Sequence, residues 1–173
     1  MGVFLTIWSE QTVVSSAFSA PVTTFIIVAA GALGALGAGW LADRVGRTLV
    51  TSVAMALSGG CALLSAWAWS GPAALMIGLL VIYGVTVIAD SAQFSAAAAE
   101  LAPPDKAGSI LTLQTALGFA LTLVTVQLLP VWADFTGWRF AFWPLALGPI
   151  IGVWAMLSLR SQDDAVKIAG GRK

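Results

Sequence analysis

Long apolar stretches alternate with short polar segments along the chain. Five of the stretches hold about 20 residues or more, which is the length an α-helix needs to cross the hydrocarbon core of a bilayer. They cover residues 20–42, 48–69, 73–99, 107–129 and 140–159. Residues 2–12 are also apolar but too short to cross, and are expected to form the end of a helix. The pattern predicts an all-α membrane protein with five full transmembrane helices and an N-terminal partial helix.

The composition strengthens this prediction and excludes several classes of function. The 173 residues are 59% hydrophobic and only 9% charged, whereas soluble domains carry about 25% charged residues. The formal net charge of zero indicates no nucleic-acid partner. Without histidine, metal sites and catalytic triads built on that residue are excluded, and the single cysteine, Cys61, cannot form an internal disulfide. With no nucleotide-binding loop and no G-x-S-x-G motif either, we expect neither an enzyme nor a cofactor.

Prolines and polar residues predict where the helices break. Pro130 is expected to close the fourth span, and Pro144 and Pro149 to kink the fifth. Residues 161–173 are expected to form a polar, mobile tail.

One face of the first span carries only small residues. Gly31, Ala35 and Gly39 recur at four-residue spacing, and such a stripe lets another helix approach closely in lipid. We expect the opposing helix to come from outside this chain.

A charged turn separates the first two spans. Asp43, Arg44 and Arg47 are the only charges between Glu10 and Asp90. Asp43 falls at the C-terminal end of its helix, where the helix dipole disfavours a carboxylate, so either a nearby cation or the N-terminus of a neighbouring helix is expected to compensate it. The segment is either a solvated turn that only fixes topology or a functional loop.

Basic residues predict the orientation in the membrane. Arg139 alone lies on one side of the five predicted spans, and seven bases lie on the other. These are Arg44, Arg47, Lys106, Arg160, Lys167, Arg172 and Lys173. Because cytoplasmic loops are enriched in Lys and Arg, the charged turn and the C-terminus are expected in the cytoplasm.

The charged turn resembles the signature loop of the major facilitator superfamily, approximately G-x-L-[AS]-D-[RK]-x-G-R-[RK]. Thr48 stands where that signature usually has a second base. The matching residues are Gly39, Leu41, Ala42, Asp43, Arg44, Gly46 and Arg47. Less specific similarities to bacterial members lie at residues 89–96, 111–119 and 137–142.

The resemblance implies a fold and partners. Residues 1–160 match the C-terminal six-helix half of such a transporter, from the end of its seventh helix to its twelfth, followed by a cytoplasmic tail at residues 161–173. It implies a bacterial inner-membrane location, a small-molecule substrate, and either the missing N-terminal half or a second copy as partner. The second and fifth spans correspond to outer helices of that half.

Two polar stripes are the candidate site. On the third span they comprise Tyr83, Thr86, Asp90 and Gln93, and on the fourth Gln114, Thr122 and Thr125. By resemblance these spans border the central cavity, so the stripes either line a hydrated substrate path or only make interhelical hydrogen bonds. Asp90 either couples ion movement to transport or is a hydrated structural carboxylate, and Glu100 is expected to be solvated.

The sequence therefore leads to two functional hypotheses. The first is transport of a small solute by alternating access, as part of a secondary active transporter and inactive alone. The second is a non-transporting membrane protein, either a remnant or a subunit that binds a membrane partner.

Overall fold

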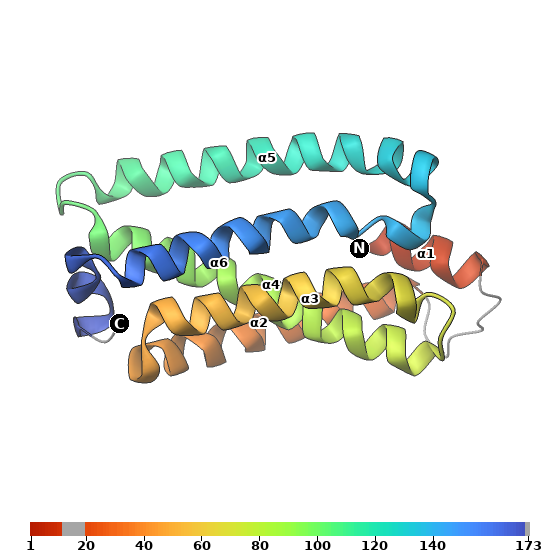
Figure 1. The fold of residues 1–173 in the computed structure, drawn as a ribbon, viewed down its shortest axis with the longest axis horizontal. Helices are drawn as coiled ribbons and strands as arrows, with labels where there is room; N and C mark the ends of the chain where they lie inside the picture. Colours follow the sequence, from red (N-terminus) through yellow and green to blue (C-terminus); the bar gives the residue numbers. More distant parts are fainter. Residues whose placement is uncertain (12–19, 172–173) are drawn as a thin grey trace.

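The computed structural model describes residues 1–11 and 20–171, which are helical almost throughout (Figure 1). The elements are α1 (Gly2–Gln11), α2 (Ala20–Val45), α3 (Arg47–Ala68), α4 (Ala73–Leu101), α5 (Ala107–Thr136), the short 3₁₀ helices η1 (Trp138–Phe140) and η2 (Trp143–Ala146), α6 (Leu147–Arg160) and η3 (Asp163–Gly171). Five segments in the described part are long and apolar enough to cross a membrane. The prediction of an all-helical membrane protein is confirmed in its coarse form, as a helical fold with five candidate spans.

The connections gather at two ends of the bundle. The α2–α3 turn, the α4–α5 loop and η3 lie at one end, which we call the turn end (Figure 1). The α3–α4 turn, α1 and η1 lie at the opposite end. The charged segments that the positive-inside rule assigned to one side of the membrane are therefore together in space.

The most extensive helix contact is the one between α2 and α4. Cβ atoms added at Gly31 and Gly34 of α2 would come within 2.8 Å of the Gly84 carbonyl oxygen and 2.7 Å of the Val85 carbonyl oxygen, respectively. An added Cβ at Gly84 would in turn lie 2.9 Å from the Ile27 carbonyl oxygen. The expectation that the small-residue face lacks a partner within the chain is wrong for Gly31, because α4 covers it. Glycine permits this close backbone approach, which helix association in lipid requires.

Helix α3 is the most enclosed of the five spans, since α2, α4 and α6 all pack against it. Most of its buried residues are small or carry a short hydroxyl group. The outer position that the resemblance implied for this span is not what the structure shows. Small side chains on several faces let three neighbours approach the same helix.

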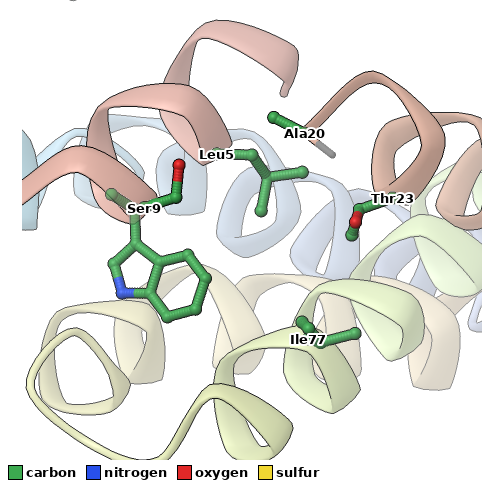
Figure 2. Close-up of a pocket in the computed structure, with 6 residues that line it drawn as sticks. Leu5, Ser9, Ala20, Thr23 and Ile77 are labelled. Carbon is green, nitrogen blue, oxygen red and sulfur yellow. The ribbon is translucent and has the colours of Figure 1, made fainter. Parts of the chain in front are cut away.

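Helix α1 docks at the opposite end through aromatic residues. The Phe4 ring packs edge-on against Trp69 and Phe142, with centroid separations of 5.4 and 4.5 Å. Trp8 donates a hydrogen bond from Nε1 to the Trp69 carbonyl oxygen at 3.0 Å. A cavity of about 10 Å³ lies between α1, α2 and α4. Figure 2 shows residues that line it, with Leu5 among them. A cavity of that volume has room for about one water molecule. The partial helix is thus a packed element of the bundle.

The prolines act differently from the prediction. Helix α5 continues through Pro130 and ends only at Thr136. The loss of one backbone N–H is tolerated there, because a helix in an apolar medium keeps its remaining bonds rather than leaving them unpaired. The actual stop is Gly137, whose φ of 88° is accessible to glycine and lets its N–H bond the Ala133 carbonyl. Pro144 lies in η2 and Pro149 in the first turn of α6, so the fifth span starts as 3₁₀ turns rather than as one kinked helix.

The C-terminal segment is not a mobile tail in its described part. Helix η3 packs on α4, α2 and α6, and the side chains of Ala165 and Ile168 are completely buried. Ile168 itself has non-helical φ and ψ angles of −87° and 137°, so η3 is kinked at this residue, and both buried side chains lie against the bundle.

Candidate functional site

The charged turn between α2 and α3 is a one-residue connection. Helix α2 ends at Val45, α3 begins at Arg47, and Gly46 between them has a φ of 116°. The Gly46 N–H still bonds back to the Ala42 carbonyl at 3.0 Å. A side chain at this position would be strained, so the sharp reversal expected of this glycine is confirmed.

Arg47 joins three helices at the turn end. Its guanidinium donates to the Gln93 Oε1 at 2.6 Å and to the two carboxylate oxygens of Glu100 at 2.9 and 3.2 Å. The same group donates to Asp43 at 3.1 Å. Only 8% of the Arg47 side chain is exposed. We call Asp43, Arg47, Gln93 and Glu100 the Arg47 clamp.

The members of the clamp differ in exposure. The Asp43 side chain is 67% exposed, so its ion pair with Arg47 is a surface contact that contributes little to stability. Through this ion pair Arg47 nevertheless supplies the compensating cation for Asp43, a carboxylate at a helix C-terminus. Arg44 lies outside the clamp, with its guanidinium 3.7 Å from the Trp40 ring centroid. The two arginines of the turn therefore have separate partners.

Glu100 is an exposed residue, as expected, but its carboxylate also has protein partners that the sequence did not indicate. Its side chain is 31% exposed and accepts both charge-assisted bonds from Arg47. Its Oε2 also accepts the Ala169 backbone N–H of η3 at 2.9 Å. Because the sequence separations are 53 and 69 residues, only the tertiary structure brings these groups together.

The α4 stripe lies inside the bundle. Thr86, Asp90 and Gln93 are buried, and Tyr83 packs edge-on against Phe142 with ring centroids 5.4 Å apart. Thr86 donates to the Ile82 and Tyr83 carbonyls of its own helix, and Asp90 accepts a bond from Ser91 at 3.2 Å. The stripe therefore continues inward from the clamp, with Asp90 one turn before Gln93.

The α5 stripe has a different environment. Thr122 is exposed and Thr125 half-buried, and their hydroxyls donate to the Gly118 and Leu121 carbonyls of α5 itself. Gln114 donates from Nε2 to Ser95 Oγ at 3.4 Å, while its Oε1 is buried without a hydrogen-bond partner in the described part of the chain. Ser95 follows Gln93 on α4 by two residues, which corresponds to a rotation of about 200° around the helix axis. The side of α4 that contacts α5 at Ser95 therefore lies nearly opposite the side that carries Gln93. The structure does not bring the two stripes face to face.

Sequence reasoning missed a third set of polar side chains, on α3. Thr48, Thr51, Ser52, Ser58 and Ser65 are buried there. The spacing Thr51, Ser58, Ser65 is seven residues, which is two helical turns and therefore one face. That regular spacing could have identified the stripe from the sequence. Ser58 and Ser65 donate to carbonyls of α3, at Met55 and Ala62, so they provide small contact surfaces rather than bonds to neighbouring helices.

An apolar groove of about 670 Å³ lies between the C-terminal half of α5 and the η2–α6 segment. Its lining includes Leu121, Leu128, Phe135, Leu145 and Ile151. The polar atoms of two further lining residues already have partners, since Thr125 bonds within α5 and Trp132 donates from Nε1 to the Phe140 carbonyl at 3.0 Å. The groove therefore suits an apolar occupant.

Comparisons with known proteins give no relative. No family model matches the chain, and no curated protein or solved structure matches it significantly. Among the residues that the structure describes, no three His, Cys, Asp or Glu side chains are grouped as metal ligands would be.

Proposed function

We propose that this chain is the C-terminal half of a secondary transporter of the major facilitator type, which moves a small solute by alternating access together with a first half. The observation that carries the proposal is the Arg47 clamp, in which Asp43 and Arg47 of the turn that resembles the family signature meet Gln93 and Glu100 of α4. Under this proposal the turn end faces the cytoplasm of a bacterial cell.

The clamp supports a conformational role for the turn. A turn that only fixes topology would leave its charges in water, whereas Arg47 is 8% exposed and bonded to α4 at two positions. Removing Arg47 and Glu100 from water carries a desolvation penalty that offsets much of their attraction, so separating them again into water costs little net free energy. Such contacts can be made and broken at small cost, which is what closing and opening one end of a solute path requires.

The helix arrangement is also consistent with inverted three-helix repeats, which occur within each half of these transporters. Helix α4 packs across the α2 and α3 pair. Repeat symmetry would place an equivalent helix across α5 and α6, where the apolar groove lies. Under the proposal, this equivalent helix is the one that precedes α2 in members of the family, and α1 corresponds to its last part.

Asp90 is the candidate coupling residue of the proposed transporter. It is 8% exposed and sits one turn from Gln93, so a change in the clamp could reach it along α4. Tyr83 and Thr86 continue the same face towards the middle of the span. The proposed substrate path follows this face of α4. The polar residues of α5 join it only if α5 moves or a partner helix bridges the two faces, and these residues are Gln114, Thr122 and Thr125.

The exposure of α5 favours a second function, a membrane subunit that binds a partner without transporting. Only 6% of the most apolar part of α5 is buried, and its stripe faces away from that of α4. Gln114 keeps a buried Oε1 without a partner in the described residues. A neighbouring helix, from a first half or from a second copy of this chain, would satisfy that acceptor.

Uptake into membrane vesicles separates the two functions. The chain is expressed in a bacterial host alone and with a separately encoded six-span first half, and a fixed panel of labelled sugars, amino acids and cationic dyes is offered. We expect saturable uptake of at least one solute only by the pair. Arg47→Ala should abolish that uptake at equal protein level, because it removes the bonds to Gln93 and Glu100.

Arg44→Ala is the matched control, since it removes the same charge from the same turn but no clamp contact, and it should retain uptake. Equal loss in both variants would mean that turn charge rather than the clamp matters. A folded pair that takes up none of the panel solutes would favour the non-transporting subunit.

A further inference from the structure

The segment that follows α6 crosses the ends of three spans. Helix η3 packs on α2, α4 and α6 at the turn end (Figure 1). A tight turn leads into it, in which the Gln162 N–H bonds the Leu159 carbonyl at 3.0 Å and the Ala165 N–H bonds the Gln162 carbonyl at 3.1 Å. With Ala165 and Ile168 completely buried, the segment is anchored by its apolar side.

The backbone then takes an uncommon conformation. Ala169 has a φ of 49°, and Gly170 and Gly171 have φ values of 63° and 89°. The left-handed conformation is unfavourable for an alanine, so surrounding contacts must hold it. It directs the Ala169 N–H to Glu100 Oε2, at 2.9 Å.

Glu100 is shared between the segment and the clamp. The Oε2 atom that accepts the Ala169 N–H also accepts Arg47 Nε at 3.2 Å, and Oε1 accepts the other Arg47 bond at 2.9 Å. A carboxylate already held by η3 loses less side-chain freedom when Arg47 binds it. By linkage, the clamp must stabilise the docked segment as much as the docked segment stabilises the clamp.

We propose that η3 is a regulatory strap that keeps the Arg47 clamp closed and whose release opens the turn end. When the strap leaves, Glu100 loses one of its three donors, and the contacts that Ala165 and Ile168 make across the helix ends are lost. The clamp is then weakened without any change in its own residues. The purpose of release, control of solute passage, rests on the proposed transport function, but the strap itself is tested without a solute.

The test uses cysteine reactivity in the purified full chain, in a Cys61→Ala background. The reporter is Thr48→Cys, because Thr48 follows Arg47 and is 1% exposed. Ala169→Pro removes the N–H donor and cannot adopt the positive φ. We expect the rate of maleimide labelling at position 48 to rise about tenfold, in line with the loss of a hydrogen bond to a charged group. Gln162→Ala, an exposed position at the start of the segment, is the control and should leave the rate unchanged.

The reciprocal measurement places the reporter in the strap. Ala165→Cys should be unreactive in the otherwise unchanged chain, become reactive when Arg47→Ala is added, and stay unreactive with Arg44→Ala. A chain terminated after Gln162 repeats the first measurement if Ala169→Pro does not fold. Unchanged labelling at position 48 in folded strap variants, or free reactivity at 165 with the clamp intact, would overturn the strap. Loss of solute uptake with both couplings present would argue only against transport.

Discussion

Helices α3 and α5 are equally apolar but have opposite environments. Their most apolar stretches have mean hydropathies of 1.7 and 1.8, yet 61% of that stretch is buried in α3 and 6% in α5. Both begin at the turn end, so they cross the bundle in the same direction (Figure 1). Neither the depth of the two helices in the membrane nor their hydropathy explains why α3 is buried and α5 is exposed.

Side-chain size does explain it. The buried residues of α3 are mostly Ala, Ser, Thr and Gly, whereas α5 exposes large residues such as Leu117, Phe119, Leu121 and Leu128. Lipid chains are as apolar as leucine, so a large apolar side chain gains little by leaving lipid for the protein interior. Small side chains allow close backbone approach and dense packing, and they select which helix becomes central.

The largest expected effect is an all-or-none difference in thiol labelling between the two ends of α5. In a Cys61→Ala background, Thr136→Cys should react with a membrane-impermeant thiol reagent in intact cells, and Asp105→Cys only after permeabilisation. The opposite labelling pattern would invert the proposed orientation and, with it, the direction of both helices.

Enlarging a glycine side chain should have different effects on stability in α3 and in α5. Gly59→Leu should destabilise the protein by about 1–3 kcal/mol, since overpacking displaces neighbours, and a Cβ at Gly59 already lies 3.0 Å from Pro149 Cβ. Gly118→Leu on α5 is the matched change, and nothing lies within 4 Å of its added Cβ. SDS-titration unfolding in mixed micelles measures both. Equal destabilisation would show that α5 is covered.

The smallest effect is expected from removing hydroxyl groups. Ser58→Ala and Thr122→Val should each change the unfolding free energy by about 0.6 kcal/mol or less, because both hydroxyls bond within their own helix. Thermal melting followed by a thiol-reactive dye on buried Cys61 is a suitable measurement. A cost several times larger for Ser58→Ala alone would mean that hydroxyl chemistry, rather than size, sets the position of α3.

Much of the architecture could be predicted from the sequence because the bilayer imposes a length and a polarity on each span. Hydropathy located five spans, and the charge distribution placed the turn, the α4–α5 loop and the C-terminal segment on one side. Gly46 indicated the reversal, and the resemblance singled out Arg47. Pro130 was misleading, because a proline weakens a helix without always ending it, and Gly137 was the real stop.

The sequence by itself determined which segments enter the membrane, since that depends on local composition. The tertiary structure alone decided what the polar residues of those segments contact. It paired Arg47 with Glu100 across 53 positions, brought the Ala169 N–H to the same carboxylate, and turned the α4 stripe inward while leaving α5 exposed. These outcomes follow from which helices can approach closely, and that depends on the summed shapes of several helix faces rather than on any single stretch.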